Sequence, residues 1–216
     1  MTSAAFLSLL QIMDSQFPIG SFAHSSGLET YALMNLSKED LAELLAVNLA
    51  CGFGRLDLAA CALAYRADSD DALYLLCEEL TAWKPVKGLR ETSLKLGKRF
   101  QTLIHRIYPQ AVDKFLDMPH QAVVLGKVAR NLQIELEPLL LAFAQSSLLS
   151  QLTAATRCMP LSPEQAQEIL LGLQESIAEV VADVLADPRA NLYAATPALD
   201  IRAQQQAHLY TRLFQS

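Results

Sequence analysis

Recognisable catalytic and metal-binding motifs are absent from this 216-residue sequence. It has no HExxH segment, no GxxxxGK[ST] loop and no GxGxxG turn, which excludes the common zinc-protease, phosphate-loop and dinucleotide-binding patterns. None of its four histidines is followed four residues later by a histidine or a carboxylate, and none of its four cysteines forms a CxxC pair. We therefore expect reduced core thiols at Cys51, Cys61, Cys77 and Cys158, with no cofactor, no tightly bound metal and no catalytic activity.

Charged residues are scarce as well, at 19% of the chain, and the formal net charge is −6. This acidic balance argues against nucleic acid as a partner. Polar residues interrupt the apolar stretches before the roughly 18 residues that a membrane span needs, so we expect no membrane segment. No Lys or Arg precedes the apolar run Ala4–Leu10, which argues against a signal peptide and for a cytoplasmic protein.

Apolar residues, by contrast, are abundant. They make up 52% of the chain, and the mean hydropathy is +0.22. Such a composition implies either an unusually large core or apolar surface that another chain covers. We favour the second interpretation and expect a homodimer that also binds other proteins.

Sustained strand-like alternation is missing too. Apolar residues recur instead at helical spacing, and proline, glycine and capping residues divide them into about nine or ten helices with no sheet. Clear start signals are the SKED box at Ser37 and the SPEQ box at Ser162. The helix that begins at Ser162 should run without a break to about Ala186. Because the connections are short, neighbouring helices should pack antiparallel in a compact bundle. Small residues inside the helices should allow close helix crossings, namely Ala59, Ala60, Ala62, Gly97, Gly126 and Gly172. The sequence predicts one all-α domain over residues 1–216.

The stretch Asp14–Tyr31, with the sequence DSQFPIGSFAHSSGLETY, is the one place where proline, glycine, aromatic, hydroxyl and histidine residues crowd together. Proline and glycine are costly inside a helix, so two helices should meet here through a non-helical elbow. Apolar side chains alternate at Phe17, Ile19 and Phe22. This alternation predicts that the elbow packs inward.

The polar residues of the elbow allow more than one interpretation. Ser21 and Ser25 can cap the following helix, with Glu29 in its first turns, where the helix dipole favours a carboxylate. A catalytic interpretation would make His24 the base and Ser25 the nucleophile of an all-helical small-molecule enzyme. However, AHSSG is not the GxSxG nucleophile elbow, and adjacent residues of a helix point apart. A generic helical adaptor is a further alternative.

The helix expected over residues 89–107 carries a basic set at Arg90, Lys95, Lys98, Arg99 and Arg106. These residues can form a solvated face with local pairs such as Glu91 to Lys95, each worth only about 0.2–0.5 kcal/mol. They can equally form a contact surface for an acidic partner.

The elbow motif closely resembles the signature of the urease accessory protein UreF family. Three further segments are similar to that family in the same order along the chain: LRETSLKLGKRF at Leu89–Phe100, PLSPEQAQ at Pro160–Gln167, and LDI followed by LYTRLFQS at the C-terminus. The resemblance therefore covers most of the chain.

This resemblance implies an all-helical, dimeric, cytoplasmic assembly factor without its own active site. The family helps to install nickel in apo-urease, bridging the scaffold accessory protein UreD (also called UreH) and the nickel-carrying GTPase UreG, and modulating that GTPase. The partner-binding residues that the resemblance implies lie in the elbow, the basic segment and the tail: Phe22, His24, Ser25, Glu29, Tyr31, Arg90, Lys95, Arg99, Tyr210, Arg212, Leu213 and Phe214.

The sequence departs from the family pattern at Phe22, where relatives often have Tyr, and at Gln206 and Ala207, where they commonly have His-Glu. Residues 199–216 form an amphipathic C-terminal docking tail, which is too short to be a stable helix alone. We expect this tail to be mobile in the isolated chain and to become ordered on the scaffold protein. Arg212 should then stack on the aromatic ring of Phe22.

Overall fold

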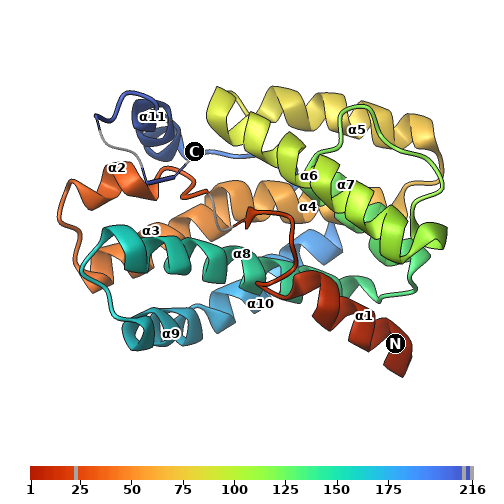
Figure 1. The fold of residues 1–216 in the computed structure, drawn as a ribbon, viewed down its shortest axis with the longest axis horizontal. Helices are drawn as coiled ribbons and strands as arrows, with labels where there is room; N and C mark the ends of the chain where they lie inside the picture. The colour runs from red at the N-terminus through yellow and green to blue at the C-terminus, as the bar shows by residue number, and fades with distance from the viewer. Residues whose placement is uncertain (22–23, 211–212, 215–216) are drawn as a thin grey trace.

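The computed structural model describes residues 1–21, 24–210 and 213–214, and no strand occurs among them. The all-helical prediction is confirmed (Figure 1). The elements are α1 (Ser3–Met13), α2 (Leu28–Ala32), α3 (Lys38–Cys51), α4 (Phe53–Arg66), α5 (Asp70–Trp83), α6 (Lys87–Ile107), a 3₁₀ turn (Pro109–Ala111), α7 (Gln121–Asn131), α8 (Leu136–Cys158), α9 (Pro163–Gly172), α10 (Gln174–Ala186) and α11 (Pro197–Gln206).

Local capping chemistry fixes several of these boundaries as predicted. Ser37 and Asp40 form a reciprocal capping box at the start of α3, and Ser162 and Gln165 form another at the start of α9. The continuous helix expected from Ser162 onward is divided at Leu173 into α9 and α10. Start signals of this kind satisfy the free N–H groups of the first turn and are readable from the sequence alone.

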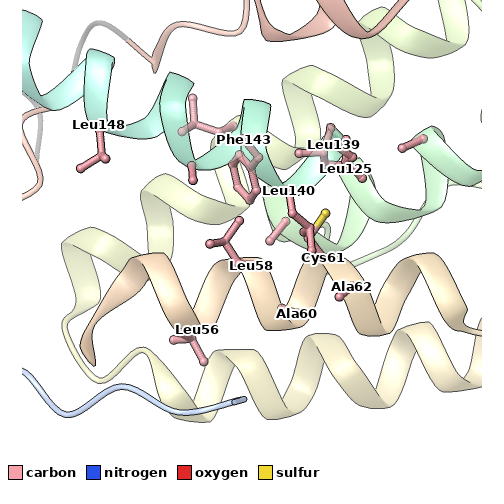
Figure 2. Packing of buried hydrophobic residues seen from close by; sticks show 14 of the residues in the cluster. Leu56, Leu58, Ala60, Cys61, Ala62, Leu125, Leu139, Leu140, Phe143 and Leu148 are labelled. Carbon is pink, nitrogen blue, oxygen red and sulfur yellow. The ribbon is translucent and has the colours of Figure 1, made fainter. Parts of the chain in front are cut away.

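Helix α4 lies at the centre of the bundle, where it packs against α3, α7, α8 and α10. Its residues 58–62 are almost completely buried. Figure 2 shows Leu58 and Cys61 of α4 between this helix and Leu140 and Phe143 of α8. The core is thus built around one small, alanine-rich helix.

Small residues were expected to permit close helix crossings, and two glycines do so. A Cβ atom on Gly126 of α7 would lie 2.2 Å from the carbonyl oxygen of Cys61 in α4, and one on Gly97 of α6 would lie 1.7 Å from that of Pro119. Gly172 is different, because a Cβ atom there would meet nothing within 4 Å. The crossing interpretation is therefore wrong for Gly172.

Replacing Gly126 with alanine is expected to lower the free energy of unfolding by about 1–3 kcal/mol, because the added methyl group meets backbone that cannot move aside cheaply. Gly172→Ala is the matched control. It adds the same methyl group in open space and should be neutral or stabilising by up to about 1 kcal/mol, as alanine is the better helix former. Urea denaturation of both variants checks this, and equal stabilities would contradict the close crossing.

Two stretches, Lys38–Arg66 and Leu136–Cys158, are long and apolar enough to cross a membrane by length and composition. This corrects the expectation that every apolar stretch is too short. The first stretch is two helices, α3 and α4, that meet at Gly52, and the second is α8. These apolar helices form the buried core of the bundle.

Candidate partner-docking site

The elbow between α1 and α2 packs inward, as its alternating apolar residues predicted. Phe17 and Ile19 are buried, and the Phe17 ring meets Phe100 of α6 edge-on with centroids 5.8 Å apart. Arg99 of α6 donates from Nη1 to the carbonyl oxygen of Ile19 at 3.3 Å and covers Gly20, which has a φ of 86°. Phe22 lies outside the described residues. The elbow is therefore anchored on α6.

Helix α2 begins without the side-chain cap that the sequence suggested. Its N-cap is Gly27 in the left-handed conformation (φ 92°), and neither Ser21 nor Ser25 caps it. Instead, α11 lies beside α2 (Figure 1). The Thr30 hydroxyl donates to the carbonyl oxygen of Arg202 at 3.0 Å, and the Arg202 guanidinium lies 5.9 Å from the centre of the Tyr31 ring.

Gln206, the last residue of α11, is only 1% exposed and connects the elbow to the C-terminal segment. Its Oε1 accepts from the Ser25 hydroxyl at 3.2 Å and from the Gly27 amide at 3.1 Å. Its Nε2 donates to Oε2 of Glu29 at 3.1 Å. The departure from the family pattern noted at Gln206 is thus a buried contact, and the sequence alone held no signal for it.

Glu29 is buried in the first turn of α2 and receives the tail. Its Oε1 accepts from the Leu213 amide at 2.5 Å, and its Oε2 accepts from the Phe214 amide at 3.4 Å. Burial, and after it the negative charge of Glu29, raises the pKa of the Cys158 thiol to about 11. The carboxylate is therefore enclosed by neutral donors and by the end of the chain.

The described part of the tail contacts the elbow through the Leu213 and Phe214 amides, and the mobility of the last residues in the isolated chain stays a prediction. Leu199 and Phe214 are buried, while Tyr210 is fully exposed and Leu213 is 70% exposed. Glu29 supplies the buried acceptors for these two amides, which helix propensity does not reveal. Arg212 and its expected contact with Phe22 lie outside the described residues.

His24 and Ser25 do not form a base and nucleophile pair in the described part of the chain. The hydroxyl of Ser25, which is 0% exposed, meets Gln206, and Nδ1 of His24 lies 3.3 Å from the Thr92 hydroxyl of α6. Burial, followed by the positive charges of Lys95 and Arg99, lowers the pKa of His24. This geometry removes the basis of the small-molecule enzyme alternative.

The basic residues of α6 divide into two groups. Arg90 is half-buried and donates to the carbonyl oxygens of Lys84 and Pro85 at 2.7 and 3.2 Å, and Arg99 holds the elbow. Lys95 and Lys98, by contrast, are exposed, and neither forms an ion pair with any residue that the structure describes. Together with Arg106, two turns further on, they form what we term the basic face.

A cavity of about 700 Å³ separates the elbow from α6, α8 and the start of α11. A buried ion pair between Lys84 and Asp57 lies in its wall, with Nζ 3.0 Å from Oδ2 and 2.9 Å from Oδ1. Asp200 of α11 also lines it, and burial raises the pKa of that carboxyl. Asp57 thus connects α4 to the end of α5 through Lys84.

The cysteines only partly match the prediction of core thiols. Cys61 and Cys77 are buried, but Cys51 is exposed and Cys158 is half-buried. Burial raises the pKa of the Cys77 thiol to about 11. No group of three or more histidine, cysteine or acidic side chains among the described residues is arranged to hold a metal ion.

Comparison with known proteins gives consistent matches. The sequence profile of the UreF family matches residues 36–174. The chain is 33% identical to the urease accessory protein UreF of Haemophilus influenzae (strain PittEE) over 221 residues, covering 96% of this chain and 94% of the relative. The chain belongs to the UreF family. It is also 29% identical to urease accessory protein UreF of Nostoc sp. (strain PCC 7120) over 224 residues, covering 100% of this chain and 98% of the relative.

Membership in the UreF family gives the chain its general role. It is a urease accessory protein, a non-catalytic chaperone involved in the maturation of urease. The resemblance inferred from the four sequence segments is confirmed. The described residues among those that the resemblance implied as partner-binding come from three places in the fold: the elbow with α2, helix α6, and the C-terminal tail.

Proposed function

We propose that this member of the UreF family acts in the cytoplasm, where it bridges the scaffold protein UreD (UreH) and the GTPase UreG. In this role it modulates the GTPase while nickel, the cargo, passes to apo-urease. Family membership supports the general role, and the arrangement of polar groups supports two separate docking surfaces. One is the basic face of α6, and the other is the elbow with the tail.

The basic face is proposed to dock the GTPase. The observation that supports this proposal is that Lys95 and Lys98 form no ion pair with any residue that the structure describes. Several other exposed cations of the chain are paired, as in Lys87 with Glu91, Lys114 with Asp70, and Arg189 with Glu79. Lys95 and Lys98 form no such pair among the described residues, although the protein carries a net charge of −6. Unpaired charges of this kind steer a partner of opposite sign and fix its orientation.

The test reverses the charge of Lys95 and Lys98, two exposed residues that form no ion pair with the described part of the chain. Lys95→Glu combined with Lys98→Glu should weaken capture of UreG at least about tenfold, because attraction to an acidic surface becomes repulsion. Arg99 is left intact, since it holds Ile19 and Gly20. Capture is measured by co-purification at two salt concentrations, with helical circular dichroism as the folding check.

The matched control reverses two other exposed cations, Lys114→Glu with Arg189→Glu, and so gives the same change in net charge on different surfaces. Their side chains are 70% and 64% exposed. Equal loss of UreG in both double variants would mean that net charge matters and the basic face does not. Unchanged capture by the Lys95 and Lys98 variant would make these residues a solvated face.

The elbow and tail are proposed to dock the scaffold protein. Tyr210 and Leu213 point into solvent from a segment whose neighbour Phe214 is buried, so the tail presents apolar side chains from a fixed base. Aromatic and aliphatic residues in such settings are common anchors at protein interfaces. His24, Ser25, Glu29 and Tyr31 would support this surface from below.

We also propose that the chain is a homodimer. Large apolar side chains remain exposed on α1, at Phe6, Leu7 and Leu10, which are 47%, 64% and 53% exposed. This supports the inference from composition that another chain covers apolar surface. Light scattering should give twice the monomer mass of 23.7 kDa at micromolar concentration, and a monomer would contradict it.

A further inference from the structure

Arg55 lies in the first turn of α4 and connects this helix to three other segments of the chain. Its Nε donates to the carbonyl oxygen of Ala50, near the end of α3, at 2.5 Å, and its Nη2 lies 3.1 Å from Oδ2 of Asp183 in α10. Its Nη1 donates to Oδ1 of Asn191, in the connection between α10 and α11. The Arg55 side chain is only 13% exposed, so water competes little for these N–H groups.

The segment 187–195, which we term the strap, follows α10 and is fastened at its middle by Asn191. This residue is 8% exposed, and its Nδ2 donates to the carbonyl oxygens of Asp183 at 3.0 Å and Asp187 at 2.7 Å. Its Oδ1 accepts from Arg55. One amide side chain and one guanidinium therefore hold the strap on both α4 and the end of α10.

The far end of the strap is fastened through its backbone. The Ala195 amide donates to the carbonyl oxygen of Cys51, the last residue of α3, at 2.7 Å. The last carbonyl groups of a helix have no partner within it, so the end of α3 offers acceptors to both Arg55 and the strap. The Arg55 guanidinium also lies 5.9 Å from the centre of the Tyr193 ring, where a cation is attracted to the aromatic face. The chain is thus held on the helical body as far as Ala195.

We propose that Arg55 is a positioning residue that clamps the strap on the junction of α3 and α4. This clamp fixes the point from which the C-terminal arm, residues 196–216, leaves the body, and it acts whether the last residues are mobile or bound to a partner. Arginine suits the task because its planar fork presents N–H groups in several directions at once, which the single ammonium group of lysine cannot do. The clamp would also set the position from which the arm reaches the scaffold protein. This last step rests on the proposed function of the tail, whereas the clamp itself does not.

The test uses the full chain with one substitution at a time. Arg55→Lys keeps the positive charge but loses the fork, so the Ala195 amide should exchange with solvent at least about tenfold faster. Asn191→Ala removes the fastening at the middle of the strap and should have the same effect, without changing a residue of any helix. Arg189→Lys is the matched control, because this arginine also belongs to the strap but meets Glu79 in an ion pair whose side chains are 64% and 38% exposed. The control should leave Ala195 exchange within about threefold of the unchanged protein.

Residue-resolved amide exchange by NMR measures all three variants, with the amides of α4 as internal reference. Acceleration confined to the strap supports the clamp. An Ala195 amide that exchanges in the unchanged protein as fast as in an unfolded chain would overturn it, as would equal acceleration in Arg189→Lys or none in Arg55→Lys. Acceleration of the strap and of α4 by the same factor would also overturn it, because Arg55 would then only stabilise the whole bundle.

Where Arg55→Lys lowers helical circular dichroism, Asn191→Ala decides, since it lies outside the helices. Capture of the scaffold protein is measured separately on the same variants. A released strap with unchanged capture would keep the clamp and contradict its use in docking.

Discussion

Replacing Lys84 with methionine is expected to lower the free energy of unfolding by about 3–5 kcal/mol, because it leaves the Asp57 carboxylate in the bundle without its cation. The Lys84 side chain is 9% exposed and that of Asp57 19%, so water replaces little of the lost interaction. Methionine keeps most of the apolar stem of lysine and therefore isolates the effect of the charge.

The paired variant makes this prediction specific. Lys84→Met combined with Asp57→Leu removes both charges and should recover most of the lost stability, since a buried ion pair is often replaceable by apolar residues. Urea denaturation of the two variants gives the comparison. A loss below about 1 kcal/mol in Lys84→Met would show that the pair is effectively solvated through the cavity.

Acidification should weaken the fold through His120. This residue is fully buried at the start of α7, with Nδ1 3.0 Å from the Ser93 hydroxyl and Nε2 2.9 Å from the Thr81 hydroxyl. Burial, followed by the positive charge of Lys84, lowers the pKa of His120 from 6.5 to about 4. The unfolded chain therefore takes up a proton at a higher pH than the folded one.

The sign of the effect follows directly. Above pH 6.5, where His120 is neutral in both states, the residue does not change the free energy of unfolding. As the pH falls from 6.5 toward 4, protonation of His120 in the unfolded chain lowers that free energy by about 1.4 kcal/mol per pH unit, for a total of about 3 kcal/mol. His120→Gln cannot titrate and should lose this part of the slope, although His24 and the carboxyl groups continue to contribute. Urea denaturation at several pH values between 7 and 4 measures it, and identical slopes for both proteins would contradict the assignment.

Local features of the fold could be predicted from the sequence because their causes are local. The capping boxes at Ser37 and Ser162 each involve residues three positions apart, and the inward packing of Phe17 and Ile19 follows from their alternation. The division of the helix at Leu173 was missed, because the neighbouring Gly172 is an isolated glycine of the kind that a helical pattern usually tolerates.

The contacts that organise the docking site could not be predicted in this way. Gln206 and Glu29 are 177 positions apart, and Asp57 of α4 meets a lysine outside its own helix. Lys84 itself lies just after the end of α5, 27 positions from Asp57. Composition and periodicity indicate which residues are polar but not which of them meet. Resemblance to the family pointed to Glu29, Lys95 and the tail, yet it marked Gln206 only as a departure. Its role becomes visible when α11 is placed on α2.

The central claim is that two separate surfaces of one non-catalytic chain bind two different partners. The most direct measurement is co-purification from cells that express urease, the scaffold protein and the GTPase. It compares the unchanged chain with Lys95→Glu combined with Lys98→Glu, and with a chain truncated after Ala207, which keeps Gln206. The account predicts that the first variant loses the GTPase and keeps the scaffold protein, and that the truncated chain loses the scaffold protein. Retention of both partners by both variants would contradict it.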